Sequence, residues 1–349
     1  MSIFSAHPKS VRRARIPYQQ EYYEGLQYEP DPVAGYRLRG NQRLPHVTVN
    51  ADGYRGRPFA GTETILLLGD SVTFGVGASS DAMCFARFLE SYTGQGVADA
   101  SVRGYRASQH FAKLPVLLDR LPDTRSVLLW CGYVDLIFWI ISGGRKEGVF
   151  QFAHTYQPDA FHHQVMTKLK DALKRITAAG PYVQRGASKP PLRPAPQGKD
   201  WREDLEELAH GMVIYIRAIR DVLEVRGIKL QVAIQPFVRN QPTGATLRHL
   251  IDGYDEKTHE KFGAGWYDIA TYFVVALHRW LAELRTICWM DCQSLVSEED
   301  FFDQVHLRED SIRRIARGLA AEVAVAPREL AVVEGQEHAP PGIASTCHE

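Results

Sequence analysis

The chain has 349 residues, of which 45% are hydrophobic, and its 41 basic and 41 acidic residues give a formal net charge of zero. This balance disfavours nucleic-acid binding, which usually requires a basic excess. The sequence contains no run of about 18 apolar residues and no apolar signal stretch near its start, so we expect a cytoplasmic protein without a membrane span.

The cysteines indicate no disulfide framework and no metal site. There are five of them, an odd number, at irregular spacings: Cys84, Cys131, Cys288, Cys292 and Cys347. Reduced thiols are the simplest interpretation. Cys288 and Cys292 have no His or Cys pair nearby at the spacing of a zinc site, and no cofactor motif is found.

The sequence predicts one main domain with three additions. Residues 1–60 are polar and weakly periodic, and we expect an extended N-terminal arm that lies on the main domain. The main domain covers residues 61–325 and contains an insertion at 143–200. The second part of this insertion, at 179–200, is rich in proline and is typical of an unpacked loop. Residues 326–349 are expected to form a disordered tail.

Alternating apolar patterns define the main domain. Short continuous apolar runs predict buried strands at residues 65–69 and 126–132, and further strands are expected at residues 97–102, 230–234 and 286–292. Helical patterns lie between and after them, at residues 81–92, 108–121, 159–178, 205–223, 243–284 (two helices) and 308–325. This alternation predicts an α/β fold with a doubly wound parallel sheet of about five strands and helices on both faces.

A serine after the first predicted strand is a candidate nucleophile. In LLLGDSVTFGVG, Ser71 follows a buried strand and the pair Gly69–Asp70. The carboxyl edge of a parallel sheet is where such folds place their sites. We expect Ser71 near a helix start, where backbone N–H groups can stabilise an oxyanion. The alternative is a serine that only caps a helix.

Near the end of the main domain, DQVH places Asp303 three residues before His306. On one loop, the Asp can hold the imidazole in a useful tautomer while the other ring nitrogen faces a serine. Alone, this spacing is common, and a surface turn with a capping Asp is the alternative. The two motifs together favour a general-base-activated serine.

With these motifs, the sequence resembles the SGNH/GDSL hydrolase family, of the bacterial type with an N-terminal arm, over residues 30–323. Four blocks occur in family order at predicted strand ends: GDS at 69–71, SVRGYRASQ at 101–109, GYVD at 132–135 and DQVH at 303–306. The resemblance implies a flavodoxin-like sheet and a triad of Ser71, His306 and Asp303. It also implies that the backbone N–H groups of Ser71 and Gly104 form an oxyanion hole.

One position departs from the family pattern. Val134 stands where the family's third block has an Asn whose side chain donates to the oxyanion, and losing such a donor typically costs about 3–4 kcal/mol of transition-state stabilisation. Three explanations stay open. Another group, with Asn240 as a candidate, can fill in; the enzyme can be slow or specialised; or the chain can bind without turnover.

The expected function is hydrolysis of an ester, such as an O-acyl group on a small molecule or carbohydrate, through an acyl-enzyme. Alternatives are an acyltransferase with the same triad and a non-catalytic binding module; the oligomeric state stays open. Arg103 and Arg106 flank Gly104 and either face an anionic substrate group or are exposed. Phe138, Trp139 and Ile140 either line an acyl pocket or belong to the core.

Overall fold

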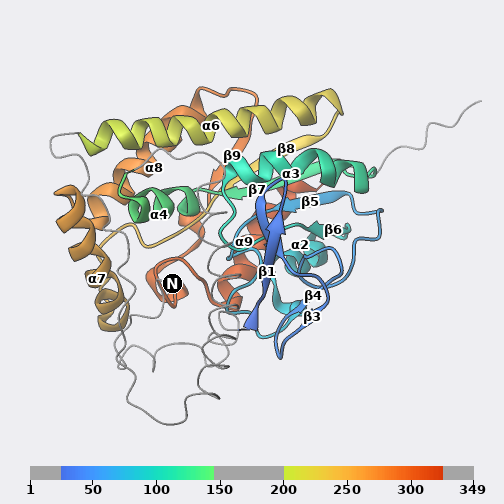
Figure 1. Ribbon diagram of the computed structural model, residues 1–349, viewed down its shortest axis with the longest axis horizontal. Coiled ribbons are helices and arrows are strands. Elements are labelled where there is room, and N and C mark those ends of the chain that lie inside the picture. The colour runs from blue at the N-terminus through green and yellow to red at the C-terminus, as the bar shows by residue number, and fades with distance from the viewer. Residues whose placement is uncertain (1–24, 145–199, 325–349) are drawn as a thin grey trace, which may run out of the picture.

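The computed structural model describes residues 25–144 and 200–324, shown in colour in Figure 1. Its centre is a five-stranded sheet whose strands pair in parallel, in the order β6-β5-β7-β8-β9. The strands are β5 (Ile65–Leu68), β6 (Val97–Asp99), β7 (Ser126–Cys131), β8 (Lys229–Ile234) and β9 (Cys288–Asp291). This order is that of a doubly wound, flavodoxin-like sheet, which confirms the predicted fold class.

The strand sequences explain their place in the sheet. Every residue of the neighbouring strands β5 and β7 is buried, as a continuous apolar run predicts for strands covered on both faces. β9 forms one edge of the sheet and is only partly buried. It covers residues 288–291, fewer than the expected 286–292. Trp130 in β7 is fully buried and belongs to the core.

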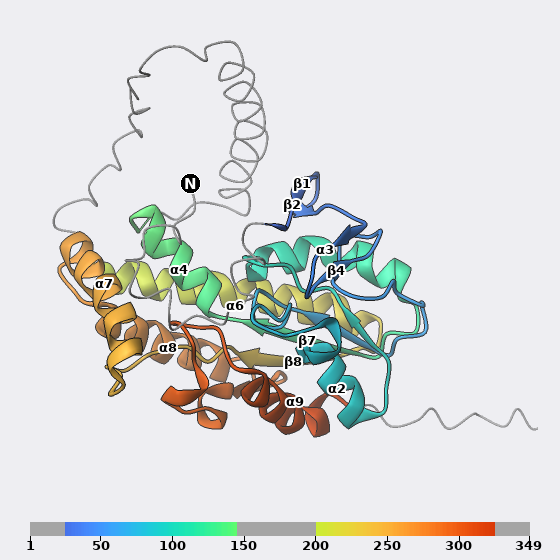
Figure 2. The same cartoon turned by 90° about the horizontal axis from the view of Figure 1, so that it is seen from below.

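Helices cover both faces of the sheet. Figure 2 shows α3 and α6 on one face and α2 and α9 on the other, and both pairs pack closely. The helices are α2 (Phe85–Thr93), α3 (Ala107–Arg120), α4 (Tyr133–Ser142), α6 (Trp201–Val225), α7 (Ala245–Phe262), α8 (Trp266–Ala282) and α9 (Glu309–Val323). Among the described residues, no helix has the length and apolar character that a membrane span requires.

The part of the arm that the structure describes is folded as two small hairpins. β1 (Tyr28–Asp31) pairs with β2 (Gly35–Leu38), and β3 (Gln42–Arg43) pairs with β4 (Thr48–Val49), both antiparallel. They lie on the side of the molecule opposite α7 (Figures 1 and 2). Leu38 and Val49 pack with Phe74 and Val76 in a small separate core. The hairpins therefore contact the segment that follows Ser71.

Three sequence predictions fall outside the described residues. These are the helix expected at 159–178, nearly all of the proline-rich segment at 179–200 and the tail at 326–349. The insertion connects α4 to α6, and both of these helices pack on the main domain.

Candidate active site

Ser71 lies at the carboxyl end of β5, the second strand in the sheet order. Gly69 is required just before it, because a Cβ at that position would lie 2.0 Å from Thr73 Oγ1. The Asp70 carboxylate accepts a hydrogen bond from the Val72 N–H at 2.8 Å, which closes a tight turn around Ser71. The serine is thus presented on a sharp turn at the sheet edge.

The expectation that Ser71 stands at a helix start is wrong. Residues 71–77 form consecutive turns, and the first helical residues come at 81–83, followed by α2. Gly75 and Gly77 have φ values of 86° and 93°, which a right-handed helix cannot contain. Ser71 therefore neither caps a helix nor receives a helix dipole.

Asp303 and His306 lie on one compact loop before α9. An antiparallel bridge between Phe301 and Leu307 closes this loop, and the Phe302 N–H donates to the His306 carbonyl. Asp303 Oδ1 accepts the backbone N–H groups of Val305 and His306 at 2.9 and 2.7 Å. The short spacing of the motif thus places both side chains in a fixed relation.

The three side chains form a continuous chain of hydrogen bonds. His306 Nε2 lies 2.9 Å from Ser71 Oγ, and His306 Nδ1 lies 2.7 Å from Asp303 Oδ2. An ionised carboxylate only accepts, so Nδ1 carries the proton and Nε2 is left to accept from the serine hydroxyl. The imidazole is 3% exposed and its ring stacks beside Phe302. This arrangement can remove a proton from Ser71.

Asp303 is held in its ionised form. Burial of its carboxyl group would raise the pKa, but the charge of His306, the hydrogen bond from its ring and the two backbone N–H groups together lower the pKa below its ordinary value. A carboxylate that stays charged near neutral pH keeps the imidazole oriented and stabilises its protonated form.

The loop after β6 brings Gly104 to the same edge. The Val102 N–H donates to the Gly69 carbonyl at 2.9 Å, and Ser101 Oγ donates to Thr73 Oγ1 at 2.9 Å, so this loop is tied to the serine turn. Among the described residues, the backbone N–H groups of Ser71 and Gly104 donate to no partner. Both remain available to an oxyanion.

Val134 occupies the second position of α4, directly after β7, and is buried. Its side chain has no polar atom, so it supplies no hydrogen bond at this edge. The neighbouring Asp135 pairs with Arg106, whose Nε lies 3.0 Å from Asp135 Oδ1. Arg106 is thus engaged within the protein rather than exposed. Arg103 is half-buried, and its carbonyl accepts the Tyr36 hydroxyl.

Asp70 is a buried acid that the sequence analysis does not single out for chemistry. Burial raises its pKa to about 7; the Val72 N–H, the charge of His306 and the Gln235 amide oppose this rise, and the charge of Asp135 adds to it. Among the described residues, neither Asp70 Oδ2 nor the Gln235 amide has a partner at hydrogen-bonding geometry. The turn around Ser71 therefore contains a buried titratable group.

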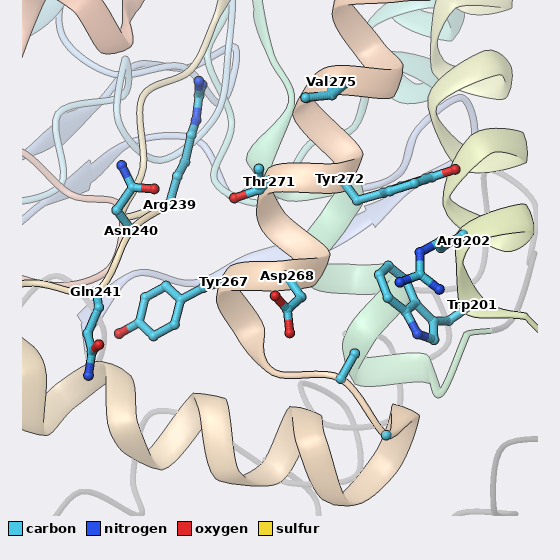
Figure 3. A pocket seen from close by; sticks show the side chains of 12 residues that line it. Trp201, Arg202, Arg239, Asn240, Gln241, Tyr267, Asp268, Thr271, Tyr272 and Val275 are labelled. Atoms are coloured by element: carbon cyan, nitrogen blue, oxygen red, sulfur yellow. The ribbon is translucent and has the colours of Figure 1, made fainter.

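An open cavity of the protein is separate from these residues. It is an open cavity of about 810 Å³ between the start of α6, the loop after β8 and α8. Figure 3 shows Asn240 and Gln241 on one side of α8 and Trp201 and Arg202 on the other. Asn240 is exposed and lines this cavity, whose lining contains none of Ser71, Asp303 and His306. The idea that Asn240 replaces the missing donor receives no support from this placement.

Two of the three remaining candidates, all on α4, belong to the protein's interior. Trp139 and Ile140 of α4 are buried, and Trp139 stacks on Phe262. Phe138 is half-buried beside Gly104, where a Cβ on the glycine would lie 3.5 Å from Phe138 Cζ. Of the three, Phe138 is therefore the one that borders the site.

Within residues 25–144 and 200–324, no cluster of three or more His, Cys, Asp or Glu could hold a metal ion.

The fold and the site define an α/β protein with a hydrogen-bonded serine, histidine and aspartate at the carboxyl edge of a parallel sheet. The sequence matches no family model, and a comparison with curated proteins finds no match.

Among solved structures, the chain resembles a protein described as belonging to the G-D-S-L lipolytic family, from Desulfitobacterium hafniense, with 11% identity, 74% of this chain and 98% of that chain covered, and a TM-score of 0.40. A GDSL-like lipase from Bacteroides thetaiotaomicron has 11% identity, coverage of 76% and 92%, and a TM-score of 0.38. The esterase EstA from a Pseudoalteromonas species has 10% identity, coverage of 75% and 96%, and a TM-score of 0.36. At these values, the function proposed below rests on the residues of this chain.

Proposed function

We propose that the protein is a serine hydrolase of the SGNH/GDSL type that cleaves an ester, such as an O-acyl group of a small molecule or carbohydrate. The observation that carries this proposal is the unbroken chain of hydrogen bonds from Ser71 through His306 to Asp303, with heavy-atom distances of 2.9 and 2.7 Å. Ser71 and His306 are 235 residues apart in the sequence, and yet their side chains meet. An Asp and a His in a simple surface turn would not need such a contact.

The proposed reaction proceeds in two halves. Ser71 Oγ attacks the acyl carbon while its proton passes to His306 Nε2, and the carbonyl oxygen becomes an oxyanion held by the N–H groups of Ser71 and Gly104. The tetrahedral intermediate collapses, the ester C–O bond breaks, and the leaving alcohol takes the proton from Nε2. Water then attacks the acyl-serine with the same assistance and releases the acid.

Two alternatives belong to the same scaffold. In an acyltransferase, an alcohol replaces water in the second half, and the triad is unchanged. A binding module without turnover draws support from Val134, because its buried apolar side chain leaves the oxyanion with one donor fewer. We favour the hydrolase because a binding module has no need for a base aligned with a serine. The proposal gives Asn240 no part in oxyanion stabilisation, and Arg103 keeps only its place beside Gly104.

Labelling with a fluorophosphonate probe tests the proposal. We expect the native chain to be labelled and the Ser71→Ala and His306→Ala variants to be unlabelled. Ser91→Ala, on the exposed surface of α2, serves as a matched serine control and should be labelled like the native chain. An unlabelled native chain that also leaves p-nitrophenyl acetate intact would favour the binding module.

A further inference from the structure

The N-terminal hairpin β1–β2 reaches the loop that carries Gly104. The hydroxyl group of Tyr36, in β2, donates a hydrogen bond to the Arg103 carbonyl at 2.9 Å, across 67 residues of sequence. Tyr36 is 1% exposed, and its contact with the half-buried Arg103 is partly shielded from water. It joins the arm to the peptide group that precedes Gly104.

That peptide group has two functional ends. The Arg103 carbonyl and the Gly104 N–H belong to one planar trans peptide and therefore point in opposite directions. A donor that fixes the carbonyl also fixes the direction of the N–H, and it polarises the peptide so that the N–H becomes a stronger donor. Among the described residues, the Gly104 N–H has no partner of its own.

The side chain of Tyr36 is held by ring packing. The Tyr105 ring packs edge-on against the Tyr36 ring at a centroid distance of 5.2 Å. The Tyr105 hydroxyl bonds the backbone carbonyl of Tyr36, at 2.5 Å, and not its side chain. Gly104 has a φ of 78°, and a Cβ there would lie 3.0 Å from the Tyr36 hydroxyl. The close approach of hydroxyl and peptide thus depends on the glycine.

We propose that Tyr36 is a positioning residue for the oxyanion hole, which orients and polarises the Arg103–Gly104 peptide so that its N–H meets the developing negative charge. This inference rests on the proposed function. It also bears on the missing side-chain donor, because a site with Val134 in the third block depends more heavily on each backbone donor that remains.

The test compares Tyr36→Phe with Tyr105→Phe. Each variant removes one buried hydroxyl from the same aromatic pair, but only the first removes the hydrogen bond to the Arg103 carbonyl. With p-nitrophenyl acetate, we expect Tyr36→Phe to lower kcat about tenfold with little change in KM, since the charge exists in the transition state. We expect Tyr105→Phe to keep kcat within about twofold. Rates are taken per site titrated with fluorophosphonate, so only folded molecules are counted.

A second readout separates positioning from loss of structure. The affinity for an alkyl boronic acid, which forms a tetrahedral anion on a serine, should fall by the same factor as kcat in Tyr36→Phe, and the pH profile should keep its shape. Equal kcat values in the two variants would overturn the inference while the hydrolase proposal stands. A native chain without labelling or turnover would instead remove the proposed function itself.

Discussion

Val134 is a buried residue of the candidate site whose side chain offers no hydrogen-bond donor. A Val134→Asn substitution places an amide at the second position of α4. If this amide reaches the oxyanion, kcat for an activated ester should rise by up to about 100-fold. Burying the amide should cost about 1–3 kcal/mol of stability where its second polar atom is unpaired. Steady-state and single-turnover kinetics measure the gain.

Val134→Ala is the matched control for that experiment, because it shortens the side chain without adding a donor. We expect no gain in kcat from it. A folded Val134→Asn variant whose single-turnover rate equals that of the native chain would indicate that the oxyanion hole is already complete.

Asp70 makes the stability of the protein dependent on pH. Its folded-state pKa is raised to about 7, so between the ordinary carboxyl pKa of 3.8 and pH 7 the folded state binds more protons than the unfolded state. Stability contributed by protonated Asp70 is therefore full below pH 4 and is lost as pH rises through 7. Asp303 acts oppositely, because its lowered pKa gives stability that is lost in acid.

An Asp70→Asn variant tests this assignment. Asn can still accept the Val72 N–H, but it carries no charge at any pH. Urea unfolding at several pH values should show that the variant loses the decline in stability between about pH 4 and 7, and that it gains on the order of 1–3 kcal/mol over the native chain at pH 8. Equal slopes for the two proteins would show that Asp70 is ionised throughout.

At the scale of elements, the arm and the serine turn are joined by a buried arginine. The Arg55 guanidinium donates to the carbonyls of Phe74 and Gly75 at 2.8 Å each and to Asp81 at 2.7 Å, and its side chain is 1% exposed. Because the guanidinium donates to two carbonyls within the turns at 71–77, it stabilises the segment that follows Ser71.

We expect Arg55→Met to cost about 3–5 kcal/mol of unfolding free energy, since it removes the charged partner of Asp81 and the buried donor to these carbonyls. Arg57→Met is the control two residues along. Arg57 is 56% exposed and pairs only at the surface with Glu90, so the loss should stay below about 1 kcal/mol. Thermal or urea unfolding of both variants gives the comparison. Similar losses in the two would contradict a special role for Arg55.

Element prediction succeeded where local pattern decides the structure. The buried strands β5 and β7 follow from their continuous apolar runs, and α6 follows from its apolar stripe. The expected helix start at Ser71 does not form, because the two left-handed glycines of the turns at 71–77 keep this segment out of a helix. The hairpins of the arm were missed because their stability comes from contacts with Phe74 and Val76 rather than from their own sequence.

The residues of the candidate site also differ in how far the sequence alone reveals them. Ser71, Asp303 and His306 were identifiable because each belongs to a short motif. Tyr36 and Arg55 carry no local signal, because their contacts join segments that are 67 and 20 residues apart. For Asp70, the sequence shows its position beside the serine, but only the fold shows that it is buried.

At the scale of the whole molecule, the insertion between α4 and α6 is a candidate for removal. Both flanking helices have their own caps: Gly143 ends α4 in a left-handed conformation, and the Asp200 carboxylate accepts the Arg202 N–H at the start of α6. The segment at 179–199 is rich in proline and lacks apolar periodicity. Deleting it should leave a single cooperative unfolding transition by circular dichroism.

Removal of the β1–β2 hairpin, residues 25–39, is the contrasting deletion. It takes away the buried side chains of Tyr36 and Leu38, so cooperative unfolding should be lost. A deletion of 179–199 that abolishes cooperative unfolding would show that this segment contributes to the core. If folding is kept and ester hydrolysis is lost, the segment instead contributes to substrate binding.

The position of the insertion also suits the protein for use as a two-fragment reporter. Residues before it contain Ser71 and Gly104 with strands β5, β6 and β7, and residues after it contain Asp303 and His306 with β8 and β9. Neither fragment holds a serine together with its base, so neither should hydrolyse an ester alone. Hydrolysis would return only when β7 and β8 pair across the division. Bait and prey proteins fused at residues 144 and 200 could then be scored for association by the release of a coloured alcohol.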